Sequence, residues 1–144
     1  MNAQDRYRVM LRDEIAPALR ARGLKGSGAT YLLPDDTHWL QIGFQSSRWN
    51  SGEEVRFTVN LAIADKAAWG HVAAERGSSN KPNPNVRSQE NRVARLGSLA
   101  FGEDRWWSIL DGSAQASGAA NVVLDAIDRV GLPWLRAKAA AAAP

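Results

Sequence analysis

Histidine, serine and carboxylate side chains could carry out catalysis in this sequence, but their placement favours no common mechanism. The chain has no cysteine, so a covalent mechanism would need a serine or threonine activated by a neighbouring base. The available bases of that kind, His38 and His71, lie far apart in the sequence. We interpret both as structural, because His38 occupies an inward-facing position of a predicted strand and His71 falls within a short predicted helix. The sequence therefore predicts no catalytic residue.

Metal, glycosidic and phosphate-loop chemistry also lack the residue patterns that they need. The adjacent acids at 35–36 are typical of a solvated turn, and no histidine–carboxylate spacing marks a metal site. The acidic pairs at 53–54 and 103–104 lie on predicted loops, and nothing sets one pair against the other as a glycosidase requires. The glycines within 23–28 follow a helix rather than a strand, the reverse of a phosphate-binding loop. We expect no metal site and no cofactor.

Tryptophan and arginine offer a different kind of chemistry, because exposed tryptophan beside arginine is typical of binding hot spots and of base-stacking surfaces. The chain has six tryptophans. Trp49 stands in a turn-rich connection, and Trp106 and Trp107 are consecutive, so in a strand they face opposite sides. Either these rings bind a partner, or loops cover them. The predicted binding residues are Trp39, Arg48, Trp49, Asn50, Arg56, Asn60, Arg95 and Trp106.

Charge and hydropathy restrict the class of protein and of partner. The net charge is +3, and the pI is about 9.7. Residues 76–95 hold five basic residues against one acid, Glu90, which indicates either a solvated surface or an anionic partner. No stretch approaches the roughly 20 apolar residues of a membrane span, and residues 1–12 show no secretory signal. We therefore expect a cytoplasmic protein with no membrane partner.

The elements that would position these side chains follow from the hydrophobic periodicity. Apolar residues recur at helical spacing over 4–22, which predicts a helix with a kink or a break at Pro17. They alternate with polar residues over 38–45 and 55–64, which predicts two strands. Residues 77–91 form the longest stretch without a predicted element, and the glycine-rich segment 23–28 reads as a linker. The remaining predicted elements are strands at 29–33, 92–99 and 105–110, and helices at 65–76 and 114–130.

The order of helix, strands and helix predicts an α+β fold. We expect an antiparallel β-sheet of about five strands packed against N- and C-terminal helices, in a single domain over residues 1–138 that is followed by a disordered alanine-rich tail at 139–144. One face of the sheet would be apolar and covered by the helices. The other face would be open and polar, with these side chains on it: Trp39, Gln41, Gln45, Arg56, Thr58 and Asn60.

A combination of segments resembles the DUF4304 family, a set of small bacterial domains without an assigned function. The segments are Ile42–Trp49, Val55–Leu61, and Arg95–Gly97 followed by Asp104–Trp107, all after a helix that ends in Gly23–Lys25. That last tripeptide has leucine at its second position, where the family usually carries an aromatic residue. The resemblance covers roughly residues 5 to 135 and implies a shared fold. It carries over no catalytic residue and no cofactor.

Three functions fit these observations. The leading hypothesis is a non-catalytic domain that binds a macromolecular partner, and one version of it is an immunity-type protein that occupies a toxin or an effector. The second is nucleic-acid binding, favoured by the basic window at 76–95, although no known nucleic-acid-binding motif is present. The third is an enzyme or small-molecule binder that uses Arg56, Asn60 and Arg95 around a pocket, since arginine suits carboxylates and phosphates.

Overall fold

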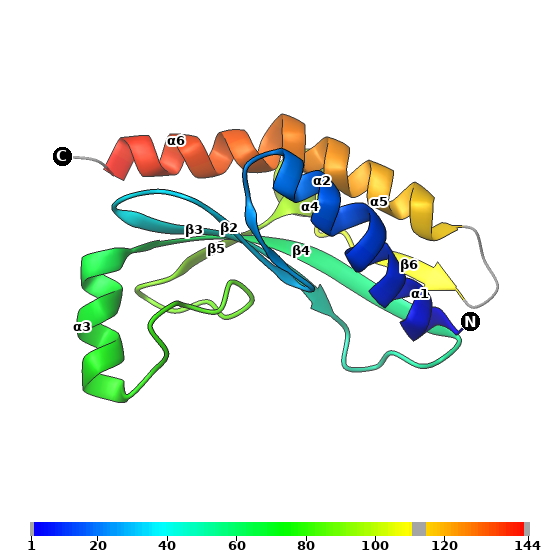
Figure 1. Ribbon diagram of the computed structural model, residues 1–144, viewed down its shortest axis with the longest axis horizontal. Coiled ribbons are helices and arrows are strands. Elements are labelled where there is room, and N and C mark those ends of the chain that lie inside the picture. The colour runs from blue at the N-terminus through cyan, green and yellow to red at the C-terminus, as the bar shows by residue number, and fades with distance from the viewer. Residues whose placement is uncertain (1, 111–114, 143–144) are drawn as a thin grey trace.

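The computed structural model describes residues 2–110 and 115–142, which form an α+β fold with helices over one face of an antiparallel sheet (Figure 1). The predicted fold class is confirmed, and the sheet has six strands where the sequence predicted about five. The strands are β1 (Lys25–Ser27), β2 (Thr30–Leu33), β3 (His38–Ser46), β4 (Glu54–Asp65), β5 (Arg92–Arg95) and β6 (Trp107–Leu110). The helices are α1 (Ala3–Met10), α2 (Ala16–Ala21), α3 (Lys66–Arg76), α4 (Leu96–Phe101), α5 (Gln115–Ala126) and α6 (Leu132–Ala142), with π-helical segments η1 (Leu11–Ile15) and η2 (Ile127–Gly131).

The long strands β3 and β4 form the centre of the sheet. Strands β1 to β4 follow one another as antiparallel neighbours. The free edge of β4 takes two short strands end to end, with β5 beside residues 60–63 and β6 beside residues 54–57. Helix α4 connects these two strands, so the chain leaves and rejoins the same edge of the sheet.

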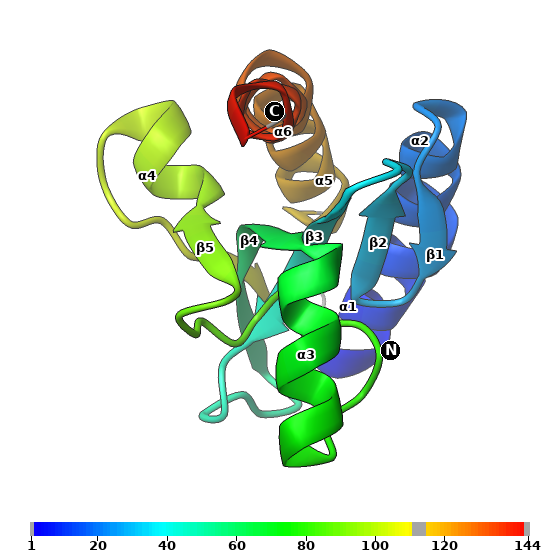
Figure 2. The ribbon, with the colours of Figure 1, turned by 90° about the vertical axis from the view of Figure 1, so that its left-hand side faces the viewer.

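Alternating apolar residues of the two central strands build the core, as their period of two predicts. They are buried and pair across the strands: Leu40 with Ile63, Ile42 with Leu61, and Phe44 with Val59. Two helical rods, α1–α2 and α5–α6, lie on this side of the sheet, whereas α3 extends away from it on the other side (Figure 2). The rods contribute Met10, Ile15, Leu19, Val123, Ile127 and Leu135 to the same core.

Pro17 is accommodated without a break in the N-terminal helix. A proline has no N–H to donate and its ring crowds the carbonyl four residues earlier. The turn just before it is π-helical, and the Ala16 N–H reaches the Leu11 carbonyl five residues back. Such wider turns are a known way of absorbing a local irregularity in a helix. The predicted kink or break is therefore a π-helical segment inside one continuous rod (Figure 1).

The C-terminal helix is longer than the sequence predicted. Helix continues from Gln115 through η2 to Ala142, not only to residue 130, and Ala139 packs against the core. The prediction of a disordered tail from residue 139 is thus wrong for residues 139–142, because alanine is the best helix former and the preceding turns are already in place. Residues 143–144 lie outside the described part of the chain, as does the predicted start of this helix at 114.

The second face of the sheet is covered in its middle, where an open polar face was predicted, while Arg56 stays exposed and Trp39 and Gln45 are half-buried. Gln41, Thr58 and Asn60 are each at most 3% exposed. The loop of residues 77–91, here called the long loop, passes on the side of the sheet opposite to α1 and α5 (Figure 1). Thr58 is covered differently, and its hydroxyl donates to the Arg105 carbonyl at 2.8 Å.

A glycine lets the long loop approach the sheet. A Cβ at Gly43 would lie 2.8 Å from Cγ of Pro84 and would collide with Oδ1 of Asn85. The Asn60 side chain donates from Nδ2 to Asn85 Oδ1 at 2.9 Å and to Gln45 Oε1 at 2.8 Å. Asn60, which was predicted to bind a partner, thus binds the protein's own loop.

Two shorter elements also differ from the prediction. The segment 23–28 is not only a linker, since it contains β1, which pairs with β2. The strand predicted over 92–99 ends at Arg95 and gives way to α4, whose start is buried at Leu96 and Gly97.

Candidate functional site

Residues 47–53 connect β3 to β4 and form an ordered loop around Trp49, called the Trp49 loop here. The Ser47 N–H donates to the Arg56 carbonyl at 2.8 Å. The Asn50 side chain accepts from the Arg56 N–H at 2.8 Å and donates back to the Arg56 carbonyl at 3.3 Å. Asn50 and Arg56 were predicted to bind a partner, and the contacts give the Asn50 amide the role of closing this loop.

Trp49 stands out from the loop into solvent. Its side chain is 85% exposed, the most exposed of the large hydrophobic side chains among the described residues. The Arg48 guanidinium lies 5.9 Å from the centre of its ring, within cation–π range. The carbonyl of Gly52 accepts a 2.8 Å hydrogen bond from the Ala3 N–H, which joins the loop to the start of α1. The loop therefore presents an indole on a support that is fixed at both ends.

A recess of about 380 Å³ lies between this loop and α1, with Tyr7, Arg8, Ser47 and Arg48 among its lining residues. The Tyr7 ring packs against Phe57, with ring centres 5.2 Å apart. Its hydroxyl is buried and has no hydrogen-bond partner among the described residues. Burial raises the pKa of Tyr7 well above its usual value, so the hydroxyl keeps its proton.

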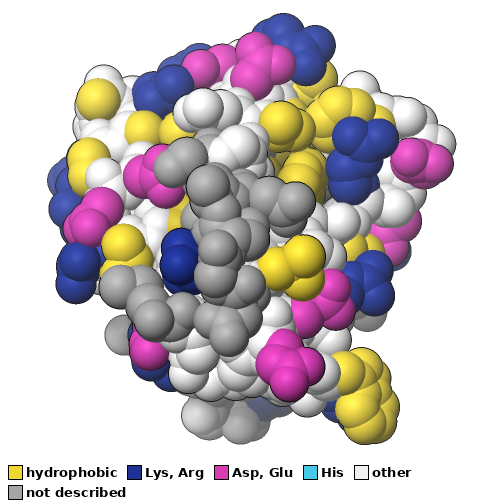
Figure 3. Space-filling view, turned by 90° about the vertical axis from the view of Figure 1, so that its right-hand side faces the viewer, with side chains coloured by type: hydrophobic (Ala, Val, Ile, Leu, Met, Phe, Trp, Pro, Cys, Tyr) yellow, Lys and Arg dark blue, Asp and Glu magenta, His cyan; other side chains and the backbone are white. Residues whose placement is uncertain are grey.

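The end of the molecule that carries the start of α1 and β6 faces the viewer in Figure 3. Described basic and acidic side chains are interspersed on this face, and no continuous area of one charge forms. The hydrophobic side chains stand singly or in small groups between them.

Arg95 and Trp106 come together at a second place, on the edge of the sheet. The Arg95 guanidinium lies 5.2 Å from the centre of the Trp106 ring and 3.3 Å from the carboxylate of Asp104. Trp106 is half-buried, while its neighbour Trp107 is 8% exposed and stacks on Phe57. The prediction that the two tryptophans face opposite ways agrees with this difference in burial.

Two further predicted residues lie away from the Trp49 loop. Trp39 is half-buried, and Lys66 Nζ lies 4.7 Å from the centre of its ring. Asn60 is 1% exposed and is held by Gln45 and Asn85. The structure thus brings Arg48, Trp49, Asn50 and Arg56 together. Asn60 and Arg95 pair with one another farther along β4, and Trp39 lies opposite Ala64 near its far end. Trp106 precedes the residue that pairs with Phe57, so it lies closer to Arg56 along the edge of the sheet.

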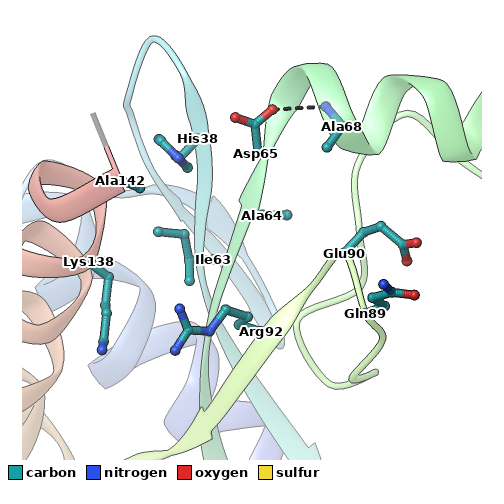
Figure 4. Close-up of a pocket in the computed structure, with 10 residues that line it drawn as sticks. All are labelled: His38, Ile63, Ala64, Asp65, Ala68, Gln89, Glu90, Arg92, Lys138 and Ala142. Atoms are coloured by element: carbon teal, nitrogen blue, oxygen red, sulfur yellow. Dashed lines mark hydrogen bonds between the residues drawn. The ribbon is translucent and has the colours of Figure 1, made fainter. Parts of the chain in front are cut away.

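Sequence reasoning missed a pocket of about 370 Å³ at the end of the sheet, called the sheet-end pocket here (Figure 4). Its walls include His38 of β3, Ile63 and Asp65 of β4, Arg92 of β5 and Lys138 of α6. Arg92 and Lys138 reach toward one another from opposite walls (Figure 4). The last turns of α6 form one wall of this pocket, with Lys138 and Ala142. The sequence placed Lys138 at the end of the domain and Ala142 in a disordered tail.

His38 is oriented by the turn that precedes it. The carboxylate of Asp35 accepts hydrogen bonds from the N–H groups of Thr37 (3.1 Å) and His38 (2.9 Å). Burial acts to raise the pKa of Asp35, but these bonds and the Thr37 hydroxyl outweigh it and hold that pKa below its usual value. The Thr37 hydroxyl lies 2.8 Å from His38 Nδ1. The one sequence signal for this turn was Asp35 two residues before Thr37, a spacing that is typical of an Asx-turn.

Neither a metal cluster nor a membrane-spanning helix is found in residues 2–110 and 115–142. No group of three or more histidine and acidic side chains gathers there. None of the helices in that part of the chain combines the length and the apolar character that crossing a bilayer requires.

Comparison with known proteins gives one match. The family model for the domain of unknown function DUF4304 matches residues 15–137, which is most of the chain. No curated protein and no solved structure matches. The match includes the segments that carried the resemblance in the sequence, namely the two central strands and residues 95–107. It also overlaps the end of the N-terminal helix. The chain therefore belongs to the DUF4304 family.

Proposed function

We propose that this protein is a non-catalytic binding domain that engages a protein partner through the Trp49 loop and the recess beside it. The observation that carries the proposal is the 85% exposure of Trp49 on a loop fixed by hydrogen bonds. Burying a large aromatic side chain contributes strongly to an interface, and tryptophan is enriched among hot-spot residues. An isolated exposed tryptophan has no stabilising role in the fold, so its exposure favours a role in binding.

The order of the loop strengthens this interpretation. Binding is weakened when loops must be fixed on association, and a loop already held in one conformation avoids that entropic cost. Both ends of the Trp49 loop are hydrogen-bonded to their surroundings, through Ser47 to Arg56 and through Gly52 to Ala3. The indole is thus presented in a defined position before any partner arrives.

The recess supplies polar groups next to this apolar anchor. Arg48 is an exposed cation on its wall, and Arg8, which is also exposed, pairs with Asp5 at 3.1 Å. We infer a partner surface with a pocket for the indole and carboxylate or carbonyl oxygens around it. An immunity-type role against a toxin or an effector is one version of this function.

Nucleic-acid binding is the alternative function. The basic residues within 76–95 support it less than protein binding, because several of them are engaged in contacts within the chain. Arg87 donates to the Val93 carbonyl at 2.6 Å, and Arg95 pairs with Asp104. Arg76 lies 4.0 Å from Glu90. Side chains engaged in this way contribute less to a continuous basic surface for phosphates.

Affinity capture from a lysate of the host cell tests the proposal, with the wild type, Trp49→Ala and Val86→Ala as baits. Val86 is 57% exposed and lies on the long loop, so Val86→Ala removes exposed apolar surface away from the site. We expect one protein to be enriched by the wild type and by Val86→Ala, and lost with Trp49→Ala. With that partner purified, Trp49→Ala should weaken binding at least about thirtyfold, the effect of a hot-spot residue near 2 kcal/mol.

Two outcomes would count against the proposal. One is that no protein shows this pattern of enrichment, or that Trp49→Ala captures the same proteins as the wild type. The other is that the chain binds DNA or RNA in gel-shift assays with an affinity that falls steeply as salt rises, which would favour the alternative. Equal unfolding free energies of the three baits would show that loss of capture does not come from loss of the fold.

A further inference from the structure

The sheet-end pocket lies apart from the Trp49 loop, at the opposite end of β4. Asp65 and Ile63 of the pocket are at the C-terminal end of β4, whereas the Trp49 loop precedes its first residue, Glu54. Its volume of about 370 Å³ is within the range of small-molecule sites, which is roughly 300–1,000 Å³. A ligand there would not compete with a protein on the Trp49 loop.

Two cations of the pocket lack an acidic partner. No ion pair joins Arg92 or Lys138 to a carboxylate within residues 2–110 and 115–142, and Lys138 Nζ lies 5.8 Å from the centre of the Trp134 ring. Figure 4 shows the Arg92 guanidinium directed toward the side of the pocket that Lys138 occupies. An anion between them would interact with both.

The acids that line the same pocket are engaged elsewhere. The Asp65 carboxylate accepts from the Ala68 N–H at 2.9 Å and caps the start of α3. The Glu90 carboxylate is turned away from Arg92 (Figure 4), and it lies 4.0 Å from Arg76. The two acids balance the two cations of the lining in formal charge, but both carboxylates lie away from the space between Arg92 and Lys138, which is therefore locally positive.

A buried histidine adds a directed hydrogen-bonding group. His38 is 5% exposed and lines the pocket, and its Nε2 has no hydrogen-bond partner among the described residues. The Thr37 hydroxyl donates to Asp35 Oδ2 at 3.2 Å, so its oxygen is the acceptor in the 2.8 Å contact with His38 Nδ1. The proton of a neutral His38 then lies on Nδ1, and Nε2 faces the pocket as an acceptor. When the ring is charged, Nε2 donates into the pocket.

Apolar side chains complete the site. Ile63, Ala64, Ala68 and Ala142 line the pocket between the charged groups. Ile63 lies next to the Arg92 guanidinium (Figure 4). Such a mixture, mostly apolar walls with a few converging polar groups, is typical of sites that bind small organic molecules.

We propose that the sheet-end pocket binds a small organic carboxylate, whose charged group lies between Arg92 and Lys138 and, when the His38 ring is charged, accepts a hydrogen bond from its Nε2. The apolar body of the ligand packs on Ile63 and the alanines. The planar fork of the Arg92 guanidinium matches the two oxygens of a carboxylate, and the lysine adds a second charge.

Titration of the isotope-labelled full chain, followed by NMR of the His38 ring and of the backbone amides, tests the proposal. The probes are 4-phenylbutyrate and hexanoate, with hexanamide as the neutral match of hexanoate and phenyl phosphate as the other anion. We expect both carboxylates to shift the His38 ring signals and the amides of Ile63 and Arg92 in a saturable way, and hexanamide to bind at least tenfold more weakly than hexanoate.

Variants separate the site from general charge effects. Arg92→Gln and Lys138→Gln should each weaken 4-phenylbutyrate binding at least tenfold. Arg136→Gln removes the same charge from an exposed position of α6 outside the pocket and should leave the affinity unchanged. The proposal is overturned if no carboxylate shifts the His38 ring at millimolar concentration, if hexanamide binds as tightly as hexanoate, or if phenyl phosphate alone binds. Arg92→Gln binding like the wild type would overturn it as well.

Discussion

The Asn60 side chain, in the middle of β4, donates from Nδ2 to Oδ1 of Asn85 over 2.9 Å and so joins the centre of the sheet to the long loop. The two residues are 25 positions apart in the chain. Asn85 in turn rests on Gly43 of the neighbouring strand, where a side chain would collide with it. The loop is therefore part of the packed structure and not a free surface segment.

Gly43→Ala should loosen the long loop. The added methyl group would meet Pro84 and Asn85, so the loop must shift and the bond between Asn60 and Asn85 must lengthen or break. Overpacking of this kind typically costs about 1–3 kcal/mol of unfolding free energy. Urea denaturation followed by circular dichroism gives that value, and limited proteolysis should show faster cleavage within residues 77–91.

Gly70→Ala is the matched control for that substitution. Gly70 lies in α3, and a Cβ there meets no atom within 4 Å. Alanine is a better helix former than glycine by about 1 kcal/mol, so this variant should be as stable as the wild type or more stable. If Gly43→Ala unfolds at the same urea concentration as Gly70→Ala, the long loop is not packed on Gly43 as described.

Trp49→Phe should remove the tryptophan that is most accessible to a soluble quencher. Trp49 is 85% exposed, whereas Trp107 is 8% exposed and stacks on Phe57. Acrylamide quenching of the fluorescence should show a clearly lower accessible fraction in Trp49→Phe than in the wild type. Trp107→Phe should lower the total emission and leave the accessible component in place, and the reverse pattern would contradict the exposure of Trp49.

Gly97→Ala should destabilise the junction between α4 and the segment before β6. A Cβ at Gly97 would lie 2.7 Å from the Cβ and 2.8 Å from the backbone nitrogen of Arg105, and backbone atoms cannot simply rotate aside. We expect a loss of about 1–3 kcal/mol in the free energy of unfolding by urea. Ser98→Ala, at the next and exposed position of the same helix, should change it by less than about 0.5 kcal/mol. A similar effect of both variants would argue against this close packing.

The sequence was informative where one local pattern decides the structure. The alternation in 38–45 and 55–64 predicted β3 and β4 with their buried faces, because a period of two places alternate residues on one side of a sheet. The same alternation cannot show what covers the polar face. That depends on Asn85 meeting Gly43 and Asn60, which precede it by 42 and 25 positions, and each of the three alone is an ordinary residue of a strand or a loop.

The two candidate sites also differ in whether a local pattern or distant segments of the chain form them. The turn residues around Trp49 predicted the loop between two antiparallel strands, which is a local feature. They left open whether the indole is exposed or covered, and the structure shows it exposed. The sheet-end pocket needs the end of β4, the start of β5 and the last turns of α6 in one place. His38 was correctly expected to be buried, but its second nitrogen faces a cavity that is formed by residues about 25 to 100 positions later in the chain.

The ion pair between Arg22 and Asp128 should make stability depend on pH in the acidic range. The Arg22 Nε lies 2.5 Å from Asp128 Oδ1, which joins the end of α2 to η2. The hydrogen bond from Arg22 lowers the pKa of Asp128 below its ordinary value of 3.8, against the opposing effect of burial. A carboxyl with a lowered pKa in the folded state stabilises the protein above the unfolded-state pKa. That contribution is lost as the pH falls from about 4 through the folded-state pKa.

Asp128→Asn should therefore be less stable than the wild type at pH 7, and the difference should shrink towards zero as the pH falls below about 4. Both partners are partly exposed, at 30% and 44% of their side chains, so we expect about 0.5–1 kcal/mol at pH 7, the upper part of the range for surface pairs. Urea is the suitable denaturant, because guanidinium salt would screen the pair. The control is Asp125→Asn, which breaks the more exposed pair with Arg129 one turn earlier in the same rod and should cost about 0.3–0.5 kcal/mol. A stability difference for Asp128→Asn that stays constant from pH 7 to pH 2.5 would show that the charge of Asp128 is not what holds α2 to η2.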